Sequence, residues 1–130
     1  MAEYVLDTHA CLFALAAPKK LGRRARRALQ LADAHGTCVW LPAAVAAEVV
    51  LLHELGRTDL GMPALRDVLE QSCWRFLPLD LRQIDEFAAL TAIRDPFDRL
   101  IVAAARSVGA KLISRDAALQ ELGLVDVIWV

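Results

Sequence analysis

Residues 95–116 read DPFDRLIVAAARSVGAKLISRD, and this stretch decides the class of fold. Asp95 suits the N-cap of a helix and a proline follows it, so the stretch predicts a helix from Pro96 to Val108. Gly109 closes that helix, since glycine tolerates the backbone conformation that a helix end requires. The run from Lys111 to Ser114 then predicts a short strand. A helix followed at once by a strand is typical of α/β proteins.

The same alternation covers the rest of the chain. Short runs rich in β-branched and aromatic residues predict strands, and longer runs bounded by Gly, Pro or capping residues predict helices. The expected strands are Tyr4–Leu6, Thr37–Leu41, Trp74–Leu79 and Val127–Val130; the expected helices are Thr8–Leu15, Gly22–Ala34, Pro42–Leu55, Pro63–Ser72, Leu81–Ile93 with Asp80 as its N-cap, and Ala117–Leu122. We therefore expect an α/β fold with a mainly parallel sheet, in which sites form beyond the carboxyl ends of strands.

The composition is that of a folded protein. The chain has 130 residues, of which 57% are hydrophobic and 24% are charged, and we expect one domain over residues 1–130. The three cysteines are far apart and form no CxxC pair, which indicates buried apolar side chains in a reducing cytoplasm rather than a zinc or redox site. Charged residues interrupt every apolar stretch, so we expect no membrane span.

The apolar run from Ala10 to Ala17 resembles the core of a signal peptide. Glu3 and Asp7, however, stand where the positive charges of a signal peptide would precede that core. We therefore expect this run to be part of the folded structure.

Basic residues are concentrated in one short segment although the net charge of the chain is −1. The segment contains Lys19, Lys20, Arg23, Arg24, Arg26 and Arg27. Taken alone, such a run is best interpreted as the solvated face of a helix. The functional alternative is a surface that contacts nucleic-acid phosphates through Lys19, Lys20, Arg23, Arg24 and Arg27.

Two carboxylates follow expected strands. Asp7 comes directly after Tyr4–Leu6, and Asp116 follows Lys111–Ser114 with one residue between them. Each has an ordinary structural role available as the N-cap of the next helix, and for either residue alone that role is the preferred interpretation. Their places at the carboxyl ends of strands also put both where α/β proteins bind ligands.

Glu48 interrupts the apolar face of its expected helix. The other members of that face are Ala44, Ala47, Leu51, Leu52 and Leu55. A carboxylate on the core-facing side is costly unless another group compensates its charge. An arginine partner and a bound cation are equally good candidates for that group.

Asp98 interrupts a second apolar face. It falls at N3 of its helix, where a capping box is possible, and it shares a face with Ile101, Val102 and Ala105. The side chain is therefore expected to point inward at a helix N-terminus, where the helix dipole favours an anion.

The four acids Asp7, Glu48, Asp98 and Asp116 are most informative as a set. Carboxylates that converge must protonate or share a cation, and an all-oxygen set suits Mg²⁺ or Mn²⁺ rather than zinc. Such ions activate water and bind a phosphodiester during its displacement. The hydroxyls of Thr8 and Ser114 stand beside two of the acids and can orient a ligand, or can be ordinary turn hydroxyls.

Four segments, in this order, resemble the PIN domain and, within that superfamily, the VapC-type toxins. They are LDTH at 6–9, AEV at 47–49, DPFDRLIVAAA at 95–105 and LISRD at 112–116, and together they span nearly the whole chain. The resemblance implies a parallel sheet of about five strands with helices on both sides.

The resemblance also implies a function. It implies an Mg²⁺- or Mn²⁺-dependent ribonuclease in which Asp7, Glu48, Asp98 and Asp116 are the metal-binding and catalytic acids. Ser114 stands where the family often has threonine and would be an accessory group. VapC-like proteins generally form homodimers and are inhibited by a small antitoxin, so both partners are expected here.

Other classes of protein fit the sequence less well. A haloacid-dehalogenase-type phosphotransferase needs a second acid two positions after the first, where this chain has His9. A phosphoacceptor receiver domain needs adjacent acids after its first strand, and these are also missing. The serious alternative is a non-catalytic PIN-like module that binds RNA or protein. Four acids that repel one another weigh against it, because a pure binding module gains nothing from them.

Overall fold

The computed structural model describes residues 2–130 and contains a five-stranded sheet. Its strands are β1 (Tyr4–Leu6), β2 (Val39–Pro42), β3 (Trp74–Leu77), β4 (Lys111–Ile113) and β5 (Val127–Ile128). The order across the sheet is β3-β2-β1-β4-β5, and every neighbouring pair is parallel. The expected α/β fold with a mainly parallel sheet of about five strands is therefore confirmed.

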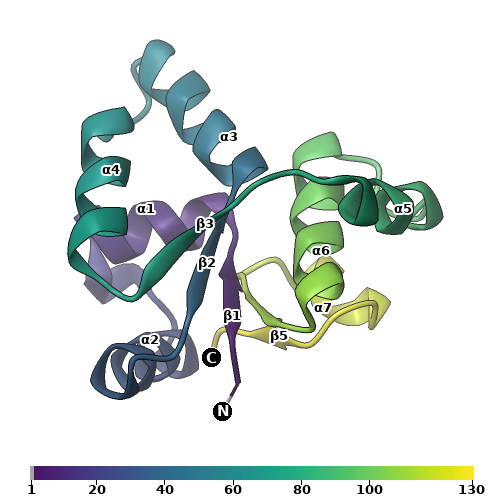
Figure 1. Cartoon of the computed structure of the whole chain (residues 1–130), viewed down its shortest axis with the longest axis horizontal. Helices are drawn as coiled ribbons and strands as arrows, with labels where there is room; N and C mark the ends of the chain where they lie inside the picture. Colours follow the sequence, from purple (N-terminus) through teal and green to yellow (C-terminus); the bar gives the residue numbers. More distant parts are fainter. Residues whose placement is uncertain (1) are drawn as a thin grey trace.

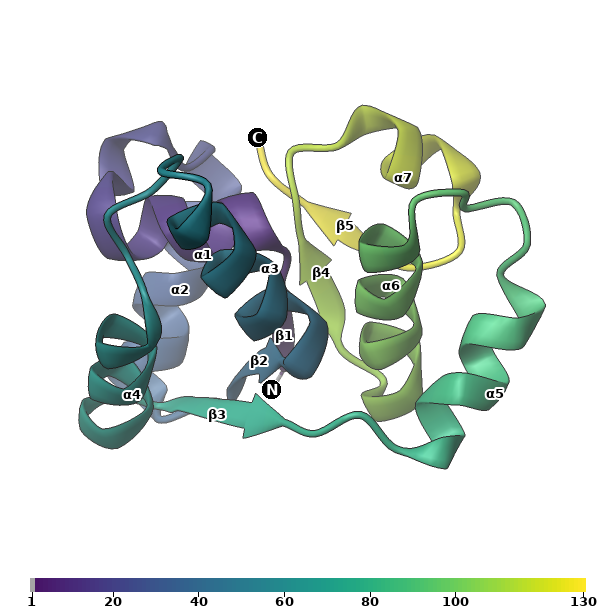
Figure 2. The same ribbon diagram turned by 90° about the horizontal axis from the view of Figure 1, so that it is seen from above.

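Helices cover both sides of this sheet (Figures 1 and 2). In both views α1, α2 and α4 lie to one side and α5 and α6 to the other. The helices are α1 (Thr8–Ala16), α2 (Arg23–His35), α3 (Ala43–Glu54), α4 (Met62–Gln71), α5 (Leu81–Ala89), α6 (Pro96–Val108) and α7 (Ala117–Leu122), with a short 3-10 helix, η1 (Pro18–Lys20), between α1 and α2. Within residues 2–130, no helix combines the length and the apolar character that crossing a membrane requires.

The predicted helix over Leu81–Ile93 is too long. In the structure α5 ends at Ala89, and a turn follows in which the Ile93 N–H donates to the Leu90 carbonyl at 3.1 Å. Leu90 and Ile93 are nevertheless buried. In the sequence, Leu90 and Ile93 continue the apolar pattern of the helix. In the structure, a non-helical turn brings these two side chains into the core.

The predicted place of Pro42 is also wrong. It was expected in the first turn of a helix, but it ends β2, and α3 begins at the next residue. Pro42 lies opposite Leu77 in the pairing of β2 with β3. The fixed φ of proline suits extended backbone as well as a helix start, so the sequence did not distinguish the two places.

The strand order brings two distant parts of the chain together. Leu6 at the end of β1 lies opposite Ile113 at the end of β4, and the Asp7 N–H donates to the Ile113 carbonyl at 3.1 Å. The chain runs from β1 to β2 on one side of β1, while β4 lies on its other side. The direction of winding therefore reverses between β1 and β4, and at such a point the strand ends leave a crevice.

Candidate active site

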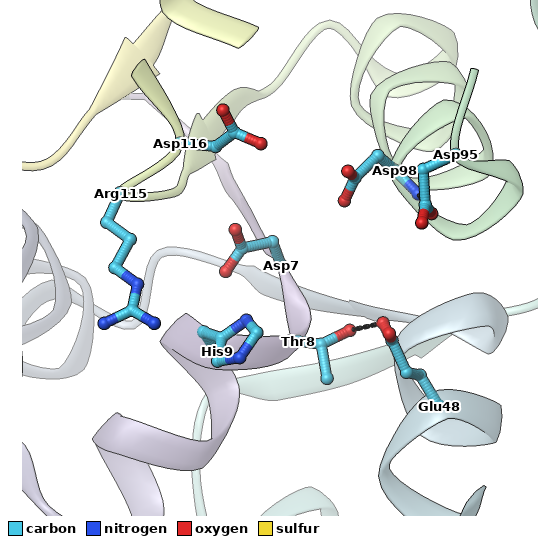
Figure 3. A pocket seen from close by; sticks show the side chains of 8 residues that line it. All are labelled: Asp7, Thr8, His9, Glu48, Asp95, Asp98, Arg115 and Asp116. Atoms are coloured by element: carbon cyan, nitrogen blue, oxygen red, sulfur yellow. Dashed lines mark hydrogen bonds between the residues drawn. The ribbon is translucent and has the colours of Figure 1, made fainter. Parts of the chain in front are cut away.

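One pocket of about 390 Å³ lies where β1 and β4 end (Figure 3). All four acids expected to form a site line it. Asp7 follows β1, Asp116 comes from the loop after β4, Asp98 from the first turn of α6, and Glu48 from α3. The remaining lining residues are Thr8, His9, Asp95 and Arg115.

Asp7 is the most buried of these acids, with 8% of its surface exposed. Its carboxylate caps α1 by accepting a hydrogen bond from the Ala10 N–H at 2.8 Å. Burial raises the pKa of Asp7, although hydrogen bonds from Ser114 and Ala10 act in the opposite direction. The predicted cap is confirmed, and it does not exclude a place in the site, because the same side chain also lines the pocket.

Asp98 lies between the core and the pocket. Its helix buries Ile101, Val102 and Ala105, so the expected inward face is confirmed. Partial burial raises the pKa of Asp98 to about 6, and repulsion from Asp95, Asp116, Asp7 and Glu48 adds to the shift. Every acid in the pocket therefore disfavours the charged form of Asp98.

Asp95 has a structural role at the start of α6. Its carboxylate accepts a hydrogen bond from the Asp98 N–H at 3.0 Å, which confirms the expected N-cap. The Asp95 side chain also lines the pocket, a place that the sequence did not predict. The sequence feature that could have predicted this place is the spacing of three residues between Asp95 and Asp98, because residues at that spacing share one face of a helix.

The expected apolar stripe around Glu48 is wrong. The buried residues of α3 are Val45 and Val49, whereas Leu51 and Leu55 are 45% and 66% exposed. Glu48 therefore lies at the edge of the buried face rather than inside it. A helix composed almost wholly of apolar residues has no clear polar face, so its sequence does not reveal which side turns inward.

The partner of Glu48 is a hydroxyl. Thr8, which is buried at the start of α1, donates its hydroxyl hydrogen bond to Glu48 Oε1 (Figure 3). Within residues 2–130, the two ion pairs join Arg106 to Glu86 and Lys111 to Asp126, so the structure offers no arginine partner for Glu48. Of the two compensating groups considered from the sequence, the arginine is excluded.

Asp116 and Ser114 are connected through the loop after β4. Asp116 caps α7 by accepting from the Ala118 N–H at 2.9 Å, as expected. Ser114 Oγ accepts a hydrogen bond from the Asp116 N–H at 3.1 Å and also bonds to the Asp7 carboxylate. Ser114 therefore holds Asp7 through its carboxylate and Asp116 through its backbone N–H.

The donor set fits a hard divalent cation. The pocket offers carboxylate oxygens from four separate segments, and the raised pKa values of Asp7 and Asp98 show that their charges are poorly compensated by the protein. Over residues 2–130, no three His, Cys, Asp or Glu side chains stand close enough to hold an ion without moving. Carboxylate oxygens of this kind are the ligands that Mg²⁺ and Mn²⁺ prefer in proteins.

The Thr8 hydroxyl offers a test of this fit. We expect Thr8→Val to weaken Mn²⁺ binding about 10- to 100-fold, because Glu48 loses the donor that orients it. Isothermal titration calorimetry with Mn²⁺ measures the effect, and Thr8→Ser, which keeps the hydroxyl, is the matched control. Equal Mn²⁺ affinities for Thr8→Val and the parent protein would show that Glu48 does not depend on Thr8.

The predicted basic residues lie outside this pocket. Lys19 and Lys20 belong to η1, and the arginines belong to or adjoin the first turns of α2, where Arg23, Arg26 and Arg27 line a separate hollow with Gln30. Arg26 donates hydrogen bonds to the carbonyls of Lys19 and Leu21 at 3.3 and 3.5 Å. The cationic side chain that does line the acidic pocket is Arg115, which the sequence did not single out.

The protein has a parallel α/β fold, and its carboxylates gather where the strand order reverses. These two features together indicate the class of protein to which the chain belongs. The family model described as the PIN domain matches residues 4–124. The chain therefore belongs to the PIN domain family, as its sequence motifs indicated. No curated protein matches the chain at a significant level.

Solved structures agree with this fold. The chain is similar to a chain of VapBC2 from Rickettsia felis bound to a promoter DNA fragment, with a TM-score of 0.74, 15% identity, and 98% and 99% of the two chains covered. For VapBC from Salmonella typhimurium bound to DNA the TM-score is 0.69 at 16% identity, with 98% of each chain covered. For FitAcB from Neisseria gonorrhoeae it is 0.64 at 23% identity, with 96% of each chain covered.

Proposed function

We propose that this protein is an endoribonuclease that hydrolyses RNA phosphodiester bonds with the help of Mg²⁺ or Mn²⁺. The observation that carries the proposal is the meeting of Asp7, Glu48, Asp98 and Asp116 in one pocket of a PIN-family chain. These four acids come from separate segments, and within residues 2–130 none of them forms an ion pair. The pocket therefore carries negative charge that a bound cation would compensate.

The four acids would hold the ion and orient the attacking water. Ala10 and Ser114 hold Asp7, and Thr8 holds Glu48, so the protein fixes the direction of these two carboxylates. All four acids line the pocket, so their oxygens outside these bonds would bind the ion and accept hydrogen bonds from water. A bound divalent ion would supply Lewis acidity at the phosphodiester. Thr8 and Ser114 would serve as accessory groups that orient the acids.

RNA would approach over the basic segment. Lys19, Lys20, Arg23, Arg24 and Arg27 are exposed on η1 and the first turns of α2. Exposed cations of this kind contact phosphates without reading sequence, so they would add affinity for any RNA. The solvated-face interpretation remains the alternative for each residue, and substitution of the whole set would separate the two.

We further propose that the ribonuclease is the toxin of a VapBC-type pair. The support is the similarity in fold to chains of VapBC complexes from Rickettsia felis and Salmonella typhimurium over almost their whole length. The partner would be a small VapB-like antitoxin, and the toxin itself would form a homodimer in the cytoplasm. A small reading frame directly upstream that encodes a DNA-binding protein would support this assignment.

The ribonuclease proposal is tested by metal dependence. We expect the purified protein to cleave single-stranded RNA or structured tRNA when Mg²⁺ or Mn²⁺ is present. Excess EDTA should stop the reaction, and renewed addition of the ion should restore it. Cleavage is followed by denaturing gel electrophoresis. Binding of RNA without cleavage under all these conditions would contradict the proposal and favour the non-catalytic module.

A further inference from the structure

The acidic pocket has a second, cationic side. In Figure 3, Arg115 and His9 lie opposite Asp98 and Asp95, with the Asp7 carboxylate between the two groups. Arg115 belongs to the loop between β4 and α7, and its side chain is exposed. A polyanion that reaches the acids therefore also passes an arginine.

Phe13 on α1 holds this arginine in place. The Arg115 guanidinium carbon lies 5.1 Å from the centre of the Phe13 ring, and the Lys20 ammonium lies 5.7 Å from the same centre. The rings of His9 and Trp129 each have their centres 6.2 Å from that of Phe13. We call these five residues, His9, Phe13, Lys20, Arg115 and Trp129, the basic-aromatic wall.

Phe13 gives the wall a rigid base. Its side chain is partly buried and packs against the hydrophobic core of the protein. An aromatic ring attracts a cation to its face, so the ring reduces the freedom of the Arg115 side chain before any ligand arrives. A guanidinium ordered in this way loses less conformational entropy when it binds.

Arg115 does not compensate the acids of the pocket. Within residues 2–130 it forms no ion pair, although five carboxylates line the same pocket. The hydrogen-bond donors of Arg115 are therefore available for an anion from outside the protein.

We propose that Arg115, positioned by Phe13 and assisted by Lys20, binds the RNA phosphate next to the one that is cleaved. This inference rests on the proposed ribonuclease function and adds a binding subsite to it. A guanidinium presents a planar pair of donors that fits two phosphate oxygens at once. The subsite sets the position and the direction of the RNA strand across the acids.

The wall reads the RNA backbone rather than its bases. The Phe13 ring already has two cationic neighbours within 6 Å and two aromatic rings beside it. Its face is therefore occupied and does not serve as a stacking platform for a base. Phosphate contacts position a nucleic acid without selecting a sequence, so the subsite contributes affinity and register.

Steady-state kinetics on Arg115 variants tests the subsite. With a short single-stranded RNA as substrate, we expect Arg115→Ala to raise KM about 10-fold and to change kcat little, as for the loss of one charged hydrogen-bonding contact. The slope of log(kcat/KM) against log salt should become shallower by about 0.7, the value for one phosphate of a single strand. Arg115→Lys should keep that slope and recover part of the KM, whereas Arg66→Ala, an exposed arginine on α4 outside the pocket, should change neither.

A modified substrate locates the phosphate. Replacing one flanking phosphate by an uncharged methylphosphonate should raise the KM of the parent protein at one position. Arg115→Ala should be insensitive to the change at that same position, because the contact is already lost. A purely structural role for Arg115 would produce no such match between one residue and one phosphate.

The outcomes separate the two proposals. An inactive parent protein would overturn the ribonuclease function and this subsite with it. An active parent together with an unchanged KM and salt slope for Arg115→Ala would overturn the subsite alone. A fall in kcat with KM unchanged would also overturn it, since Arg115 would then act on the acids. Phe13→Leu, which keeps an apolar side chain on the core, should raise KM about 3-fold if the ring orders Arg115.

Discussion

Replacing Asp98 by asparagine is expected to remove RNA cleavage and, without divalent ions, to make the protein more stable. Burial and four neighbouring carboxylates raise the pKa of Asp98 to about 6, well above its value of 3.8 in an unfolded chain. Between these two values the folded state binds more protons than the unfolded state, so stability falls as pH rises. Above pH 6 Asp98 is charged in the folded state, and the full destabilisation of the folded protein is present. Asparagine carries no charge, so the substitution removes this destabilisation.

The expected gain is modest because Asp98 is only half-buried. A rise of the pKa from 3.8 to about 6 corresponds to about 3 kcal/mol. Water screens a partly exposed charge, so we expect Asp98→Asn to raise the free energy of unfolding by about 1 kcal/mol. Activity should fall by about 100-fold or more, in line with the loss of one group that stabilises a transition state. Growth arrest on expression should disappear with it if the protein is a toxin.

Thermal unfolding at pH 8 in EDTA and cleavage assays with Mn²⁺ measure the two effects. Asp85→Asn is the matched control, because Asp85 is exposed on α5 and lies outside the pocket. It should leave both the unfolding temperature and the cleavage rate unchanged. An Asp98→Asn protein that is active, or that unfolds at a lower temperature than the parent in EDTA, would contradict the assignment of Asp98 to the acidic site.

Mn²⁺ or Mg²⁺ is expected to stabilise the protein strongly above pH 6 and weakly at pH 5. Asp7 and Asp98 both have raised pKa values, so both hold protons more readily in the ion-free folded state than in the unfolded chain. An ion requires the deprotonated carboxylates, and protons compete with it as the pH falls. The unfolding temperature should therefore rise with added ion at pH 8, and this rise should diminish as the pH falls through about 6.

The size of the effect follows from the affinity. An ion present at 100 times its dissociation constant adds about 2.7 kcal/mol to the free energy of unfolding. Differential scanning fluorimetry at pH 8 and pH 5, with NaCl at matched ionic strength as the control, separates specific binding from screening. Equal gains at the two pH values would contradict binding through these carboxylates, as would a gain that NaCl reproduces.

Local rules predicted most of the secondary structure. The helices Pro96–Val108 and Ala117–Leu122 have the predicted bounds in α6 and α7. Both begin after an aspartate whose side chain accepts the N-cap hydrogen bond, and both end at a glycine with φ near 65°. Such signals depend on residues within one helical turn of each other, so they can be recognised in the sequence. The end of α5 has no such signal, because no glycine or proline directly follows it and the apolar Leu90 and Ile93 beyond it are buried in the core.

The sequence identified the acids of the pocket better than their surroundings. Asp7 and Asp116 were placed by the ends of β1 and β4, and Asp98 by the buried face of α6. The prediction of Glu48 rested on an apolar stripe of α3, but that stripe is not the buried face of the helix. Arg115 was missed, because its contact with Phe13 joins residues about one hundred positions apart.

The sequence by itself determined the class of fold, the helix caps and the presence of carboxylates at strand and helix ends. These depend on hydrogen bonds and periodicities that span a few residues. The tertiary structure alone decided that β4 lies beside β1, that Thr8 bonds to Glu48, and that a cationic side faces the acids. Those contacts join distant segments through packing, and packing is a property of the whole folded chain rather than of any local stretch.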